Sequence, residues 1–152
     1  MKFDTEHKFA LLRIAFGFVW AVDAYFKWLP EVRYHIVDVL TQAQVGQPMW
    51  EQVWIGWWAH LASLDPTLFG TGIAVIETML ALSLITGVFS RAAKYCGVLF
   101  ALMIWSVPQG FGGPYAPGTT DIDSGIIYVF LFIALIVGHA WRRYNVLNLF
   151  KK

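Results

Sequence analysis

Four ionisable side chains lie within long apolar stretches of the sequence, where they could transfer protons or bind a charged ligand. They are Arg13, Asp23, Lys27 and Glu77. Asp23 precedes Lys27 by four residues, so the two side chains share one face of a helix in the order that favours an ion pair. A charge inside hydrocarbon costs on the order of 3 kcal/mol, so these groups must pair with one another or contact water.

The four charges together predict a buried and electrically neutral cluster. If the helices that carry Arg13 and Glu77 run antiparallel, Glu77 lies at a depth between Arg13 and Asp23, within reach of the guanidinium. We expect Asp23, Lys27 and Glu77 to act as the catalytic groups and Arg13 to contact the substrate. Two simpler interpretations stay open: Arg13 and Lys27 extend to opposite membrane surfaces, or the cluster only joins two helices.

A second group of candidate residues follows the third apolar stretch. Segment 108–123 contains three prolines and four glycines, so it cannot remain helical and can bring bare backbone close to a ligand. We expect a substrate pocket lined by Tyr115, Thr119, Thr120 and Asp121. The last three residues would equally serve as ordinary N-caps of the following helix. Tyr128 in that helix is a further substrate-binding candidate that could hydrogen-bond to the charged cluster, or an ordinary packed aromatic.

The elements that must position these residues are typical of membrane-spanning helices. Crossing a bilayer takes roughly 20 helical residues, and the sequence has four such apolar stretches, at about 9–29, 68–89, 93–111 and 124–141. Apolar residues make up 58% of the chain and charged residues only 14%, which excludes a nucleic-acid-binding protein and most water-soluble proteins. We therefore predict an all-α fold in which residues 1–152 form one integral membrane domain, a four-helix transmembrane bundle.

The distribution of positive charge predicts the orientation of this bundle. Lysine and arginine gather before the first stretch, between the second and third, and after the fourth, whereas Arg33 is alone in the two remaining loops. By the positive-inside rule, both termini face the cytoplasm and loops 30–67 and 112–123 face outward.

The outward segment 31–64 predicts one or two amphipathic helices. Trp50, Trp54, Trp57 and Leu61 follow one another at helical spacing, and four of the eight tryptophans lie between positions 50 and 58. Indole rings prefer the headgroup region, so these helices are expected to lie on or fold over the outer membrane surface. The alternative is a tryptophan surface that docks a partner or covers a cavity.

No residue pattern indicates a haem, a flavin or a metal site. Cys96 is the single cysteine, which excludes an intramolecular disulfide, a CxxC redox pair and a cysteine-built cluster. A bis-histidine haem needs two facing imidazoles, and only His139 lies in a predicted span. Among the remaining histidines, His35 and His60 have no diagnostic ligand spacing.

The same residues, taken in order, resemble the DoxX/DoxD-like family of four-helix membrane proteins over about two-thirds of the chain. The matching features are Arg13 with Gly17, the helix end at 23–28, Glu77 with Gly87, and the glycine- and proline-rich stretch 112–121 that leads into Tyr128. The resemblance implies a left-handed four-helix bundle in the cytoplasmic membrane of a prokaryote. DoxD-like relatives are similar to a subunit of thiosulfate:quinone oxidoreductase. The long tryptophan-rich segment departs from many relatives.

Two functions follow as expectations. In the first, the chain is an integral membrane subunit of a quinone-linked oxidoreductase that acts on thiosulfate or a related sulfur compound. Quinone would then be a co-substrate near Trp20, Phe26 and Trp28, exchanging protons with Asp23 or Glu77. In the second, the chain is a noncatalytic scaffold or an accessory subunit of a redox complex. For either function, the expected partners are the lipid bilayer and a protein subunit in the membrane or at its outer face.

Overall fold

The computed structural model describes residues 4–115, 122–141 and 144–146, and within these ranges the fold is all-α, without a strand. Seven α-helices and one short 3-10 helix are present in this part of the chain. In order they are α1 (Thr5–Trp28), α2 (Pro30–Arg33), α3 (Ile36–Ala43), α4 (Met49–Leu64), α5 (Pro66–Thr86), α6 (Ser90–Ser106), η1 (Gly110–Gly112) and α7 (Asp123–Val137).

Two of these helices, α1 and α5, are long and apolar enough to cross a membrane. Local sequence signals fix their ends. Asp4 caps α1 by accepting a hydrogen bond from the backbone N–H of His7 at 2.9 Å, and Asp65 caps α5 by accepting one from Leu68 at 2.9 Å. Gly87 ends α5 in the left-handed conformation, with φ of 79°, as is typical of a helix C-terminus.

The other two predicted spans are shorter than the sequence indicated. Helix α6 has 17 residues and α7 has 15, against the expected stretches 93–111 and 124–141. At 1.5 Å per residue, α7 rises only about 22 Å. The apolar composition continues beyond Ser106, but Pro108 and Gly110 interrupt the helix there, and Gly138 follows the end of α7.

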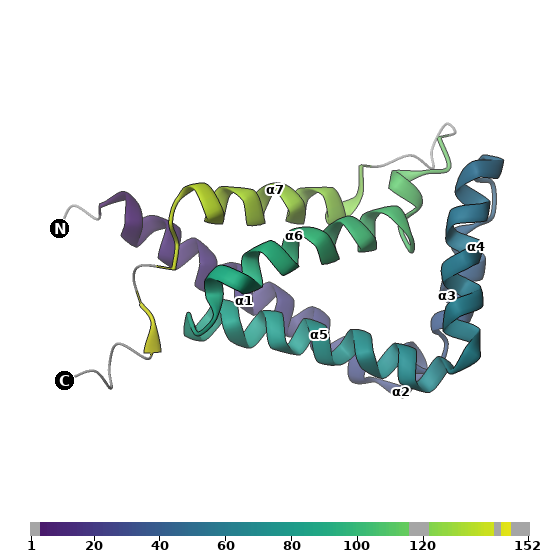
Figure 1. Ribbon diagram of the computed structural model, residues 1–152, viewed down its shortest axis with the longest axis horizontal. Coiled ribbons are helices and arrows are strands. Elements are labelled where there is room, and N and C mark those ends of the chain that lie inside the picture. The colour runs from purple at the N-terminus through teal and green to yellow at the C-terminus, as the bar shows by residue number, and fades with distance from the viewer. Residues whose placement is uncertain (1–3, 116–121, 142–143, 147–152) are drawn as a thin grey trace.

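The four long helices pack as two pairs. Helix α1 lies along α5, and α6 lies along α7, with fewer contacts between the pairs (Figure 1). Glycines permit the close approach within each pair. A Cβ on Gly17 would lie 2.8 Å from Cγ1 of Ile85 in α5, and one on Gly97 would overlap the ring of Phe132 in α7.

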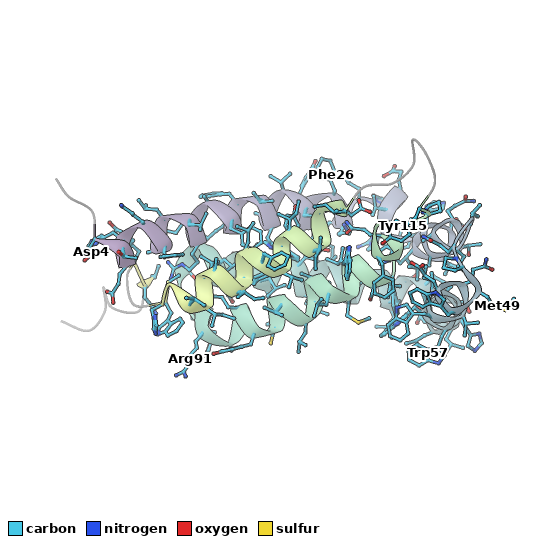
Figure 2. The ribbon with its side chains drawn as sticks, turned by 90° about the horizontal axis from the view of Figure 1, so that it is seen from above. Asp4, Phe26, Met49, Trp57, Arg91 and Tyr115 are labelled. Atoms are coloured by element: carbon cyan, nitrogen blue, oxygen red, sulfur yellow. The ribbon has the colours of Figure 1, made fainter. Side chains whose placement is uncertain are left out.

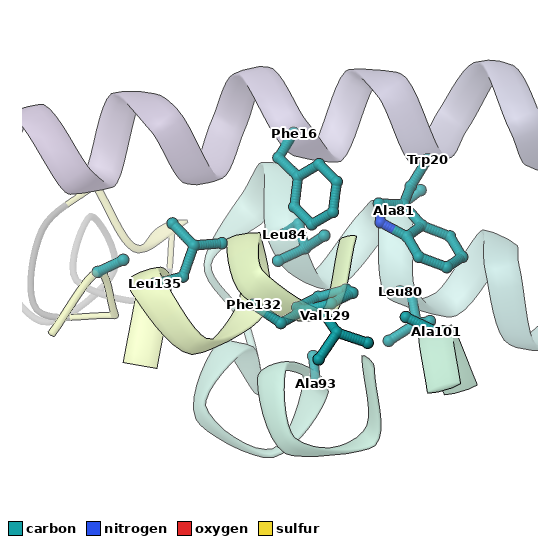
Figure 3. Close-up of a cluster of buried hydrophobic side chains, with 11 residues drawn as sticks. Phe16, Trp20, Leu80, Ala81, Leu84, Ala93, Ala101, Val129, Phe132 and Leu135 are labelled. Carbon is teal, nitrogen blue, oxygen red and sulfur yellow. The ribbon is translucent and has the colours of Figure 1, made fainter. Parts of the chain in front are cut away.

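One apolar core joins the two pairs. Figure 3 shows Phe16 and Trp20 of α1 meeting Leu84 of α5 and Phe132 of α7. The rings of Phe16 and Phe132 have centroids 4.9 Å apart in an edge-to-face arrangement, and Trp20 and Phe132 are both fully buried. This core positions the α1 residues that follow Trp20.

Helices α3 and α4 lie across one end of the bundle, roughly perpendicular to its long axis (Figure 1). They form a second core that contains Ile36, Leu40, Ile55, Ala59, Ala62 and Val107. Trp50 and Trp57 are 62% and 56% exposed, whereas Trp54 and Trp58 pack against this second core. The predicted amphipathic helices are thus present, but α2 and α3 are separate helices, and α3 and α4 are anchored on the bundle.

Candidate functional site

The charged cluster predicted from the sequence is present in part, as three residues that we call the triad. Nζ of Lys27 lies 3.5 Å from Oδ1 of Asp23 and 3.7 Å from Oε1 of Glu77. Asp23 and Lys27 occupy successive turns of α1, and Glu77 reaches them from the middle of the adjacent α5. The spacing of four residues and the packing of α1 along α5 bring the three groups together.

Burial is uneven within the triad. The Glu77 side chain is 1% exposed, while those of Lys27 and Asp23 are 29% and 35% exposed. Neither carboxyl oxygen of Glu77 has a hydrogen-bond partner among the described residues. The triad holds two acids and one base, so a proton added to Glu77 would leave a neutral pair of Asp23 and Lys27. This arrangement can bind and release a proton in an apolar environment.

Arg13 is not part of the triad, and the prediction of a four-charge cluster is wrong in this respect. Its Nη1 donates a hydrogen bond to the carbonyl oxygen of Ala140 at 3.1 Å, and its Nη2 donates to that of Tyr144 at 2.8 Å. The guanidinium takes these carbonyl oxygens, beyond the end of α7, as acceptors in place of the Glu77 carboxylate. The Arg13 side chain is fully buried inside the protein, so it does not extend outward from the helices either.

Aromatic rings lie beside the triad. Trp20 is fully buried one turn before Asp23, and its ring centroid lies 5.6 Å from that of Tyr128 and 6.0 Å from that of Phe100. Nε1 of Trp20 has no hydrogen-bond partner in the described chain. Tyr128 packs against Trp20 and Phe16, and none of the hydrogen bonds of the described residues joins it to the triad.

Beside the contact between α1 and α5 lies a small apolar groove of about 210 Å³. It is lined by Ala24, Tyr25, Trp28, Thr78 and other residues of α1 and α5. Nε1 of Trp28 donates to the hydroxyl of Thr78 at 3.1 Å across it. Thr78 is the neighbour of Glu77 in the sequence, so the groove and the triad occupy adjacent faces of the same helix pair.

The second predicted group of site residues is not joined to the triad. The hydroxyl of Tyr115 donates to the backbone oxygen of Phe111 at 2.6 Å, and the side chain of Tyr115 lies at the α3–α4 end (Figure 2). Thr119, Thr120 and Asp121 lie outside the described residues. An open cavity of about 630 Å³ at this end is lined by residues that include Asp38, Gln47 and Asp123.

A buried acid that the sequence analysis missed lies near this cavity. Glu51 of α4 is 0% exposed, and both of its carboxyl oxygens lack hydrogen-bond partners in the described structure. It is close to Gly110, because a Cβ there would lie 3.2 Å from Oε1 of Glu51. The sequence contains a signal for this burial, because Glu51, Ile55, Ala59 and Ala62 share one helix face, but the tryptophan spacing alone does not reveal it.

Burial raises the pKa of the Glu51 carboxyl. The folded protein therefore binds this proton more tightly than the unfolded chain does. The contribution of Glu51 to the free energy of unfolding is fully present at low pH. It is lost as pH rises from about 4.5, the ordinary pKa, through the raised pKa of the folded protein. Glu51→Gln should remove this part of the pH dependence and raise the unfolding midpoint at neutral pH. Thermal unfolding in mild detergent between about pH 4.5 and 8 tests this expectation.

Glu31→Gln provides the control for this measurement, because Glu31 is exposed at the start of α2. It should unfold with the pH profile of the wild-type protein. Equal pH slopes for Glu51→Gln and the wild type would contradict the assignment.

The chain matches no known protein family, no curated protein and no solved structure. The resemblance to DoxX/DoxD-like proteins therefore stays a prediction.

Proposed function

We propose that α1, α5, α6 and α7 cross a prokaryotic cytoplasmic membrane as a four-helix bundle. Large apolar side chains exposed on these helices support the proposal. Phe18, Val22, Met79, Leu99 and Phe130 are each more than half exposed. A water-soluble monomer rarely leaves so much apolar surface open, whereas acyl chains would cover it at no cost. The segment through η1 extends α6 toward the α3–α4 end and lengthens the apolar region.

The orientation with both termini in the cytoplasm is part of this proposal. Asp4 and Arg91 lie at one end of the molecule, and Met49, Trp57 and Tyr115 lie at the other (Figure 2). Arg91 belongs to the positively charged connection between α5 and α6, so its end would face the cytoplasm. Helices α3 and α4 would then lie along the outer surface, with exposed indoles at headgroup level.

Within this membrane domain, we propose that the triad is the proton-exchange site of a quinone-linked oxidoreductase, of which this chain is a subunit. The observation that carries the proposal is the buried Glu77 carboxyl, which lacks a hydrogen-bond partner among the described residues and lies 3.7 Å from the Lys27 ammonium. Reduction of a quinone consumes two electrons and two protons. A buried acid beside a hydrogen-bond donor is suited to supplying protons in an apolar environment.

Each residue of the triad has a role in this reaction. Lys27 donates a hydrogen bond to a quinone carbonyl, and Glu77 and Asp23 exchange protons with its oxygens. Trp20 and Tyr128 offer ring surface to the quinone headgroup. A partner subunit, acting on thiosulfate or a related sulfur compound, supplies the electrons, because carboxylates, an amine and aromatic rings do not store an electron pair.

A noncatalytic role as scaffold or accessory subunit is the second candidate. The exposed Trp50 and Trp57 on α4 favour it, because large aromatic surfaces are typical of binding interfaces. In that role the triad would only join α1 to α5.

Quinone binding distinguishes the two candidates. The full-length protein in nanodiscs of neutral lipid would be titrated with decylubiquinone and a menaquinone analogue, with quenching of tryptophan fluorescence as the readout. We expect saturable quenching that Glu77→Gln and Asp23→Asn weaken about tenfold or more, which is typical of losing a hydrogen bond to a charged group. Glu31→Gln is the control and should bind as the wild type does.

Two outcomes of the quinone titration would contradict the proposed site. Quenching that rises linearly with quinone, or that is the same in Glu77→Gln and the wild type, would overturn the quinone site. If the chain still assembles with a redox partner in that case, the scaffold role is favoured.

A further inference from the structure

Two buried cations lie far from the triad, toward the end of the bundle opposite α3 and α4. Arg13 of α1 and Lys94 of α6 are each 0% exposed. Lys94 is within electrostatic range of Arg13. The ion pairs among the described residues involve other groups, so neither cation contacts a carboxylate there. Two positive charges are therefore buried without an ion-pair partner in the described part of the chain.

Neutral groups accept hydrogen bonds from only some of the N–H donors of these two cations. Arg13 donates to two backbone carbonyls through Nη1 and Nη2, but its Nε has no partner within residues 4–115, 122–141 and 144–146. Nζ of Lys94 has no hydrogen-bond partner in the described part of the chain and lies 4.3 Å from the centroid of the Trp141 ring. A cation–π contact offsets part of the desolvation of one ammonium, but a buried charge without a counter-charge remains unfavourable.

The first turn of α6 adds further donors. Ser90 begins this helix, is 2% exposed and has an unpartnered hydroxyl. It precedes Lys94 by four residues, so both side chains share one helix face. No described side chain caps the helix N-terminus, where backbone N–H groups and the helix dipole attract an anion. Arg13 reaches the same place, because a Cβ on Gly87 would lie 2.8 Å from its Nη1.

We propose that Arg13, Ser90 and Lys94 bind a phosphoryl group at the N-terminus of α6, supplied by the headgroup of an anionic phospholipid. Such a group presents several acceptor oxygens, so Nε, Oγ and Nζ can donate to it together while its charge neutralises the two cations. Arg91, which is exposed and lies 5.7 Å from the centroid of the Trp141 ring, extends the positive surface outward. The ligand replaces the missing anion.

The membrane placement proposed above supplies the lipid. In that placement the start of α6 lies at the cytoplasmic face, where basic pockets between helices bind anionic headgroups. The proposal depends on this membrane placement but not on quinone binding. Its test therefore measures which lipid the protein retains, and not whether a quinone binds. A free phosphate ion has the same recognition chemistry, so the experiment must separate the two sources.

Lipid retention by the full-length protein tests the site. Nanodiscs with equal amounts of phosphatidylglycerol and phosphatidylcholine are dissolved, and native mass spectrometry measures which lipid stays bound. We expect the wild type to prefer phosphatidylglycerol. Lys94→Met should lower this preference about tenfold or more and Ser90→Ala several-fold, since each loses a charge-assisted hydrogen bond. Lys8→Gln, which removes an exposed cation of α1 at the same end, should change nothing.

A second arm identifies the source of the phosphoryl group. Inorganic phosphate is added to the protein in nanodiscs of phosphatidylcholine alone, and the unfolding midpoint is followed. One outcome is that phosphate stabilises the wild type but not Ser90→Ala, while the wild type shows no preference for phosphatidylglycerol. This outcome would assign the site to a free phosphate ion and overturn the proposal that a lipid headgroup binds there. If Lys94→Met fails to fold, Ser90→Ala carries the test. Wild-type lipid preference in Ser90→Ala, with no effect of phosphate, would overturn the site itself.

Discussion

Lys27→Met is expected to destabilise the folded protein by about 3–5 kcal/mol, the cost of removing one partner from a buried ion pair. The substitution leaves the Glu77 carboxyl buried in α5, with its side chain 1% exposed and no cation nearby. Asp23 also loses its contact, but it is one-third exposed and can be hydrated. Reversible unfolding in mixed micelles measures the loss.

A double-mutant cycle assigns this loss to one contact. Glu77→Gln removes the buried charge while keeping the shape, so Lys27→Met combined with Glu77→Gln should recover most of the lost stability. Lys8→Met is the matched control, because Lys8 is exposed on the same helix, and it should change stability by less than about 0.5 kcal/mol. A double variant that is no more stable than Lys27→Met would show that Lys27 does not act through Glu77.

Phe132→Ala is expected to destabilise the protein by on the order of 3 kcal/mol. Its ring is fully buried in α7, where it contacts the rings of Phe16 and Trp20 and lies against Gly97 of α6. The loss comes from the empty volume that the ring leaves behind and from the missing van der Waals contacts. The same unfolding experiment measures it.

Phe130→Ala separates packing from apolar character in this prediction. Phe130 is two residues away on the same helix but is 65% exposed. Its removal should cost far less than that of Phe132. Equal losses at the two positions would mean that the core between the helix pairs does not hold the bundle together.

The triad could be predicted because its determinants are local. Asp23 and Lys27 are one helical turn apart, and antiparallel packing of two consecutive long helices sets the depth of Glu77. Helix ends with strong signals, such as Asp65 before α5 and Gly87 after it, were also predictable from residue type alone.

The partners of Arg13 could not be predicted in this way. Its two acceptors, the carbonyls of Ala140 and Tyr144, lie 127 and 131 residues away and depend on how the chain continues after α7. Backbone carbonyls occur at every position, so composition cannot show which of them a guanidinium will take. A carboxylate partner is the natural expectation from sequence, and it was wrong here.

Two further buried charges show that the apolar content of a segment does not predict which of its ionisable side chains are buried. Lys94 lies near the start of an apolar stretch, where a lysine is normally solvated, and Glu51 lies among tryptophans. Both are buried because residues distant in the sequence cover them: the Trp141 ring lies against Lys94, and Gly110 lies close to Glu51. Burial of this kind depends on tertiary contacts between segments that are far apart in the sequence. The placement of α3 and α4 across the end of the bundle depends on such contacts too.

The attachment of Arg13 beyond α7 also determines where the two helix pairs can move apart. That attachment, together with the aromatic core, fastens α1 to α7 on the side of Arg91. Thermal fluctuation should therefore open the pairs mainly near Lys27, on the side of α3 and α4. In the membrane placement proposed above, a hydrophobic guest would then enter sideways from the outer leaflet, and its exchange rate would depend on how ordered the acyl chains are.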